Sequence, residues 1–187
     1  MDYPVEQFEN QKELEKWLEQ NAGSDGVWLK LAKKGSGETT VSYAEAVESA
    51  LCYGWIDSQA KTFDDKFYIQ KFTPRRAKSV WSVKNRQKVE QLMAAGRLKP
   101  AGLAQVEAAK ADGRWDAAYE GQSTAEAPAD FLEALAKNKK AAEFYESLSK
   151  SNKYAIIWRL HHSKKPETRA ANVNKFIAML AAGKTFH

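Results

Sequence analysis

The sequence is poor in cysteine and histidine: its 187 residues include one cysteine, Cys52, and three histidines. One cysteine cannot form an internal disulfide bond, so we expect a reducing compartment. Residues 1–17 are polar and acidic and lack the basic and apolar segments of a secretory signal. No apolar run approaches the roughly 20 residues that span a bilayer. We therefore expect a cytoplasmic protein without a membrane span.

The same scarcity disfavours a metal centre. The sequence has no CxxC or HxxxH pattern, and His161 and His162 are neighbours that would point about 100° apart on a helix. We expect His161 to be a core residue on the apolar face of its helix and His162 to be solvated. The segment AAGKT, residues 181–185, lacks the upstream glycine of a phosphate-binding loop. The sequence thus predicts no metal ion and no cofactor.

Two segments have almost no acidic residues. Residues 66–89 contain eight bases and no acid, and residues 150–187 contain eight bases and one acid. By contrast, residues 1–65 contain thirteen acids and six bases. The net charge of +5 is therefore unevenly distributed. This pattern favours local contacts with an anion over uniform, non-specific binding of nucleic acid.

Hydrophobic residues make up 43% of the sequence and include six tryptophans, which is enough to form a core. In residues 1–120, helical spacing with capping residues predicts four helices, and alternating apolar residues predict a strand and a β-hairpin. The predicted helices are residues 10–23, 42–54, 79–96 and 99–113, the strand is 26–37, and the hairpin is 56–72. We therefore predict an α+β domain with a small antiparallel sheet flanked by helices.

Residues 121–127 are small and polar, and they predict a linker between residues 1–120 and residues 128–187. Only helical patterns follow, at residues 128–138, 139–150, 151–162 and 166–184. The expected buried face of the third helix consists of Tyr154, Ile157, Trp158 and His161. The sequence thus predicts a C-terminal all-α helical module, near the lower size limit for an independent core.

Cys52 is the first candidate for catalysis. A thiolate nucleophile needs a nearby base or positive charge, and the histidines are all distant in sequence. Free cysteine is among the most buried residue types and packs as a small hydrophobic side chain. We expect Cys52 to pack near the end of a helix that Gly54 terminates. An enzyme that uses Cys52 is left as one alternative.

The strongest chemical feature is QKFTPRRAKSVWSVKNRQK, residues 70–88, which passes from a strand through Thr73-Pro74 into the start of a helix. Cations oppose the helix dipole at such a position, and conflicts of this kind are common at functional sites. Arginine pairs bind phosphate or carboxylate bidentately, serine hydroxyls donate hydrogen bonds, and tryptophan offers a stacking face. A site for an anion or another polar ligand is therefore one interpretation.

A second interpretation of this segment is structural. Arg75 and Arg76 would then pair with acids of residues 1–65, and Trp81 would lie in the core. Asp57 could orient one of the arginines across the sheet, or it could simply belong to a turn. Under the first interpretation, the predicted ligand-binding residues are Trp55, Asp57, Arg75, Arg76, Lys78, Ser79, Trp81 and Ser82.

The segments ALCYGWIDS (50–58), FTPRRAKSVWS (72–82) and VEQLMAAGRLKPAG (89–102) resemble the YdeI/OmpD-associated, or bacteriocin-protection, family. Its members typically read close to ALCFGWIDS and RFTPRRPKSVWS, so all the predicted ligand-binding residues match, and Ala77 replaces the usual proline. Residues 127–184, which include an ETR segment ending at Arg169, resemble the helical module of that family, the OmdA domain.

The resemblance implies a role in stress or bacteriocin resistance and brings no established reaction with it. Combined with the basic segments, it predicts a non-enzymatic binding protein whose ligand is a small anionic molecule or an acidic partner surface. The main alternative is nucleic-acid binding through residues 66–89 and 150–187, with Trp81 and Trp158 between the bases.

Overall fold

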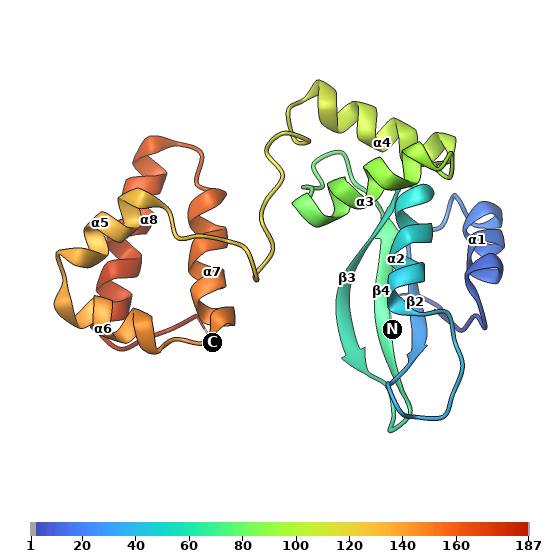
Figure 1. The fold of residues 1–187 in the computed structure, drawn as a ribbon, viewed down its shortest axis with the longest axis horizontal. Helices are drawn as coiled ribbons and strands as arrows, with labels where there is room; N and C mark the ends of the chain where they lie inside the picture. The colour runs from blue at the N-terminus through green and yellow to red at the C-terminus, as the bar shows by residue number, and fades with distance from the viewer. Residues whose placement is uncertain (1–2, 187) are drawn as a thin grey trace. The chain divides into compact units, whose positions relative to one another are not determined.

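The computed structural model describes residues 3–186. These residues form two compact units, with the boundary between Ala118 and Tyr119. Each unit has a hydrophobic core of its own, and Figure 1 shows the helices and strands of both units. None of the described helices is long and apolar enough to cross a membrane.

A four-stranded sheet forms the centre of the N-terminal unit, in the order β1-β2-β4-β3. Strands β2 (Val27–Ala32), β4 (Phe67–Pro74) and β3 (Trp55–Thr62) are antiparallel, and β3 and β4 form the predicted hairpin. The predicted α+β class is therefore confirmed. The short strand β1 (Val5–Glu6) pairs parallel with β2 and is an addition to the prediction, because two residues carry no visible alternation.

The helices of this unit lie at the predicted positions. They are α1 (Gln11–Gln20), α2 (Tyr43–Cys52), α3 (Val83–Ala94) and α4 (Pro100–Ala111). The Ser42 hydroxyl accepts a hydrogen bond from the Glu45 N–H at 3.3 Å, and the Glu45 carboxylate accepts one from the Ser42 N–H at 2.9 Å. This reciprocal pair is the capping box predicted at the start of α2.

One face of the sheet packs against α1 and α2 (Figure 1). The core between them includes Leu14, Leu18, Val27, Leu29, Leu31, Ala46, Ala50 and Phe72. Helices α3 and α4 pack on α2 instead, and they enclose a second core. That core includes Leu51, Cys52, Trp81, Val89, Leu92, Val106 and Trp115. Cys52 is thus a packing residue, as the sequence predicts.

Helix α4 approaches the end of α2 very closely. The Lys99 N–H donates to the Cys52 carbonyl at 3.1 Å. A Cβ atom added at Gly102 would lie 2.3 Å from the same carbonyl oxygen. Gly54 follows α2 with a φ of +78°, and a Cβ there would lie 2.9 Å from the Ala101 carbonyl oxygen. Two glycines therefore let the backbones of α2 and α4 touch.

The C-terminal unit contains the predicted helices. They are α5 (Ala129–Ala136), α6 (Lys139–Ser147), α7 (Lys150–His161) and α8 (Pro166–Ala181). Arg169, from the ETR segment, pairs with Asp130 of α5 at 2.7 Å and donates to the Leu160 carbonyl near the end of α7 at 2.9 Å. In this structure, Arg169 therefore fastens three helices together.

The buried face of α7 differs from the prediction. Ile156 and Leu160 are buried together with Ile157 of the predicted face, whereas Trp158 is 38% exposed and His161 is exposed. His162, expected to be solvated, is half-buried and stacks on Trp158. Apolar residues occur on most sides of this helix, so spacing alone fits two faces. Packing against α8 selects the face that contains Leu160.

Candidate functional site

The residues predicted to bind a ligand in the N-terminal unit lie in several places. Trp55 belongs to the core beneath the sheet and Trp81 to the core around α3, and each is 2% exposed. Asp57 accepts a hydrogen bond from the Tyr43 hydroxyl at 2.7 Å, and burial together with this bond raises the pKa of Tyr43. Lys78 is exposed in the loop before α3. The two tryptophans therefore face separate cores rather than a common cavity.

Arg75 is 6% exposed, a rare position for an arginine. Its guanidinium carbon lies 3.6 Å from the centroid of the Trp81 ring, and Nη1 donates to the Val80 carbonyl at 3.2 Å. The Arg75 N–H donates to the Gly54 carbonyl at 2.9 Å. These contacts fix the loop that follows β4 against the second core, so Arg75 has a structural role.

A small cleft of about 330 Å³ lies beside this loop. It is lined by Tyr3, Asp25, Thr73, Pro74, Arg75 and Arg76. Arg76 is exposed, and its N–H donates to the Ser79 hydroxyl at 2.9 Å. The Ser82 hydroxyl caps α3 by accepting from the Asn85 N–H at 3.1 Å. Asp25 places a negative charge in the lining, which opposes an anion there, and ligand binding by these residues stays a prediction.

Two bases that follow the loop pair with acids of the first 65 residues. Lys88 pairs with Glu48 at 2.9 Å, and Arg97 joins Glu48 and Glu15 at 3.0 Å each. The hydrogen bond from Lys88 holds the pKa of the Glu48 carboxyl below its usual range. Lys88 of residues 66–89 therefore pairs with an acid of residues 1–65, whereas the structural interpretation named Arg75 and Arg76 for such pairs.

Cys52 is 1% exposed, and burial raises the pKa of its thiol to about 11. Its thiolate is therefore scarce at neutral pH. We expect the native protein to react slowly with the thiol reagent DTNB, followed by absorbance, and to react quickly once guanidinium chloride unfolds it. A fast reaction of the native protein would contradict this burial and would revive the alternative of a Cys52 enzyme.

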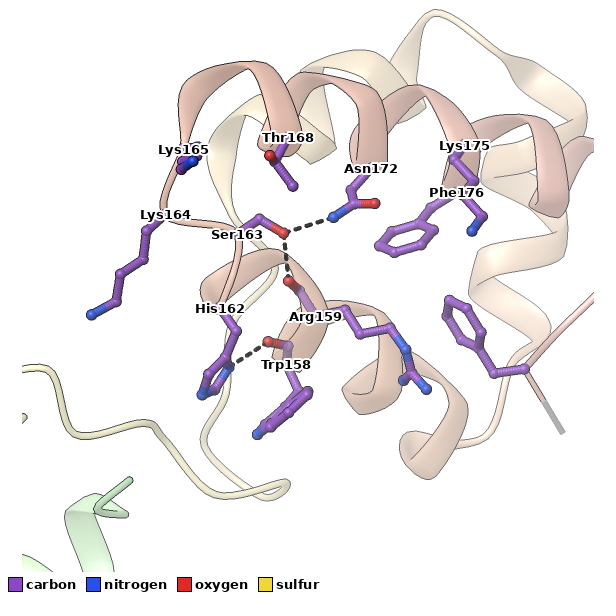
Figure 2. A pocket seen from close by; sticks show the side chains of 11 residues that line it. Trp158, Arg159, His162, Ser163, Lys164, Lys165, Thr168, Asn172, Lys175 and Phe176 are labelled. Carbon is purple, nitrogen blue, oxygen red and sulfur yellow. Dashed lines mark hydrogen bonds between the residues drawn. The ribbon is translucent and has the colours of Figure 1, made fainter. Parts of the chain in front are cut away.

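A larger cleft lies in the C-terminal unit, between the end of α7 and the first three turns of α8 (Figure 2). Its volume is about 530 Å³. Residues of α7, the following turn, α8 and the C-terminal segment line it: Trp158, Arg159, His162, Ser163, Lys164, Lys165, Thr168, Asn172, Lys175, Phe176 and Phe186. Within residues 3–186, no group of three or more His, Cys, Asp or Glu side chains is placed to hold a metal ion.

The lining of this cleft is strongly basic. Four of its side chains are cationic: Arg159, Lys164, Lys165 and Lys175. The described lining residues include no carboxylate, and within the described chain none of these four bases takes part in an ion pair. The cleft therefore holds positive charge that the described residues of this unit do not neutralise through ion pairs.

Hydrogen bonds hold the frame of the cleft in place. Arg159 Nη1 donates to the Ala155 carbonyl at 2.8 Å, and the guanidinium carbon lies 4.0 Å from the centroid of the Phe186 ring. The buried Ser163 hydroxyl donates to the Arg159 carbonyl and accepts from the Asn172 amide, both at 2.8 Å (Figure 2). These bonds fix the turn between α7 and α8, and with it the positions of the bases.

The two ends of the cleft differ in chemistry (Figure 2). Lys164, Lys165 and Thr168 lie where α8 begins. The first N–H groups of a helix lack acceptors within it, so this end also carries the positive end of the helix dipole. Phe176 lies farther along α8 and packs edge-on against Phe186, with 5.2 Å between ring centroids. The cleft therefore has Lys164, Lys165 and a helix N-terminus at one end, and the rings of Phe176 and Phe186 beside Arg159 and Lys175 at the other.

Trp158 and His162 form a further part of the wall. Their rings stack with 4.0 Å between centroids, and His162 Nδ1 lies 2.8 Å from the Trp158 carbonyl. Because a carbonyl oxygen only accepts hydrogen bonds, Nδ1 carries a proton. His162 Nε2 is the remaining ring nitrogen that a ligand could meet.

From the sequence, ligand binding is expected at the loop of residues 75–82, and the cleft is missed. The sequence feature that points toward the cleft is the charge of residues 150–187, which contain eight bases and one acid. Spacing along the chain does not show that Arg159, Lys164 and Lys175 converge, because their convergence depends on the turn between α7 and α8.

The geometry defines an α+β protein with a C-terminal helical unit that carries a basic cleft. Residues 6–105 match the model of a family described as a domain of unknown function (DUF8412), and residues 124–183 match the family described as bacteriocin-protection, YdeI or OmpD-associated (OmdA). The first match covers more than half of the chain, so the chain belongs to the DUF8412 family and carries an OmdA domain at its C-terminal end.

The resemblance stated from the sequence is confirmed for the C-terminal unit. The N-terminal segments quoted for it fall within residues 6–105, which match the DUF8412 model instead. Comparison with curated proteins and with solved structures gave no significant match.

Proposed function

We propose that this protein is a non-enzymatic binding protein for an organic anion and that the cleft between α7 and α8 holds the ligand. The observation that carries this proposal is that Arg159, Lys164, Lys165 and Lys175 line one cavity, with no carboxylate among its described lining residues. Hydrogen bonds from cationic groups to phosphate or carboxylate are roughly twice as strong as neutral ones. An anion in the cleft would offset the repulsion among the four bases.

The size and the two ends of the cleft support an organic anion rather than a bare inorganic one. A volume of about 530 Å³ lies within the range of roughly 300–1,000 Å³ that small-molecule sites occupy. The charged group would lie near Lys164 and Thr168, where α8 begins. An apolar or aromatic part of the ligand would then contact Phe176 and Phe186.

The description of the C-terminal family, bacteriocin protection, supports placing this binding in a response to toxic stress. The predicted binding role of the loop at residues 75–82 is separate from this proposal. Its ligand would lie in the N-terminal unit, and the cleft does not depend on it.

Isothermal titration calorimetry with phenyl phosphate and with inorganic phosphate tests the proposal. We expect phenyl phosphate to bind at one site per chain, roughly fivefold more tightly than inorganic phosphate because its ring contacts the aromatic end. Both affinities should fall as salt rises, since exposed charges are screened. No heat with either anion would refute anion binding, and equal affinities would refute the role of the aromatic end.

A further inference from the structure

The sheet of the N-terminal unit has a second face, opposite the one that packs on α1 and α2. Directly paired residues share a face, and Leu29 and Phe72 belong to the helix-covered core. Trp28, which pairs with Lys71, therefore lies on the other face, together with a row in which Ile69 pairs with both Lys30 and Lys61. Phe67, paired with Ala32, continues this face toward the hairpin end. None of these paired residues is a carboxylate.

The lysines on this face lie over aromatic rings. Lys30 Nζ is 4.0 Å from the ring centroid of Phe67 and 5.0 Å from that of Phe63. Lys61 Nζ is 4.8 Å from the Trp28 ring, and Lys71 Nζ is 4.6 Å from the Tyr3 ring. We call this surface the lysine–aromatic face; its members are Lys30, Lys61, Lys71, Tyr3, Trp28, Phe63 and Phe67.

Trp28 and Phe67 are buried, yet they belong to neither core of this unit. Lysine stems cover aromatic surface while their ammonium groups reach water, so such burial is reversible when the stems move. Phe63, at the hairpin end, is 43% exposed. The face therefore carries one ring in the open and others beneath lysine side chains.

The lysines of this face form no ion pairs among the described residues, although the charge of Lys30 contributes, after backbone hydrogen bonds, to the lowered pKa of the Asp64 carboxyl. Lys66 and Lys88 of the same unit pair with Glu38 and Glu48. Within residues 3–186, by contrast, Lys30, Lys61 and Lys71 form no ion pair. Positive charge alternating with aromatic rings on a sheet is complementary to a chain of phosphates that carries bases.

We infer that the lysine–aromatic face binds single-stranded nucleic acid. The ammonium groups would turn from the rings to phosphates, and bases would stack on Phe63 and on the rings thereby uncovered. A duplex keeps its bases paired and stacked, and an acidic peptide lacks bases. Neither can therefore contact the lysines with its charges and stack bases on the rings. This inference concerns different residues from the cleft of the C-terminal unit and goes beyond the organic anion proposed there.

Fluorescence anisotropy of the full chain with a labelled oligothymidylate of about 12 nucleotides tests the inference. The triple variant Lys30→Gln, Lys61→Gln, Lys71→Gln should lose at least about tenfold in affinity. The slope of log K against log salt should become shallower by roughly 2, since each lost phosphate contact removes about 0.7. Phe63→Ala, which keeps all charges, should lose about tenfold in affinity for the oligothymidylate. Its affinity for labelled polyglutamate, an anionic chain without bases, should change little.

A matched control is Lys12→Gln, Lys16→Gln, Lys84→Gln, which removes the same charge from exposed lysines of α1 and α3. An equal loss in this control, or an unchanged affinity in Phe63→Ala, would overturn the inference. So would equal affinity for a duplex of the same length, or binding to anionic phosphatidylglycerol vesicles without binding to the oligothymidylate. The variant Lys164→Glu with Lys175→Glu should still bind the oligothymidylate, which would show that this face acts separately from the cleft. Loss of oligothymidylate binding in this variant would overturn the inference.

Discussion

Replacing Gly102 by alanine should lower the free energy of unfolding of the N-terminal unit by about 3 kcal/mol. The added Cβ would lie 2.3 Å from the Cys52 carbonyl oxygen and 2.8 Å from that of Leu51. Both are backbone atoms of α2, so no side-chain rotation relieves the clash. Helix α4 would have to move away, which would weaken the hydrogen bond from the Lys99 N–H to Cys52 and loosen the core around Trp81.

Thermal unfolding followed by circular dichroism measures this loss, and we expect the melting temperature of the N-terminal unit to fall by roughly 10 °C. Gly23→Ala is the matched control, because a Cβ there meets no atom within 4 Å. That change should alter stability by no more than about 0.5 kcal/mol. An unchanged melting temperature in Gly102→Ala would show that α4 is not held against α2 as closely as described.

Reversing two charges of the cleft should weaken the binding of phenyl phosphate by at least about 100-fold. The change is Lys164→Glu with Lys175→Glu, two exposed residues that line the cleft from the turn and from α8. Each lost charge-assisted hydrogen bond costs roughly 1.5–3 kcal/mol, and the new carboxylates also repel an anion. Both lysines are exposed, and neither forms an ion pair with another described residue, so the fold should be preserved.

The control variant Lys137→Glu with Lys140→Glu changes the net charge equally in the same unit but outside the cleft. We expect it to bind phenyl phosphate within about threefold of the unchanged protein, because exposed charges are screened beyond about 10 Å. Calorimetry measures both variants, and circular dichroism verifies their helices. If the two variants lost affinity equally, the effect would come from net charge, and the cleft would not be the site.

Features set by neighbouring residues could be read from the sequence. The capping box of Ser42 and Glu45 is one, because both partners lie within one helical turn. The ends of the β3–β4 hairpin and the stop of α2 before Gly54 are others, since turn and glycine preferences act locally. The fold class followed from these local signals.

The clefts depend on tertiary packing, which local sequence patterns do not show. Arg75 and Arg76 were predicted together as ligand-binding residues; the guanidinium of Arg75 is buried on Trp81, Arg76 is exposed, and ligand binding there stays a prediction. The basic residues of the cleft belong to two helices and their turn, so their convergence is invisible in the spacing of Arg159 and Lys175. The buried face of α7 is a related case. Its apolar residues fit two possible buried faces, and packing against α8 decides between them.

Nuclear magnetic resonance of the full ¹⁵N-labelled chain during titration with phenyl phosphate tests the central claim most directly. Binding in the cleft predicts that the backbone signals of Ser163, Thr168 and Asn172 shift together and saturate with one affinity. The signals of Arg76 and Ser79 should stay in place. Shifts at the loop of residues 75–82 without shifts around Ser163 would contradict the account and would return the site to the N-terminal unit.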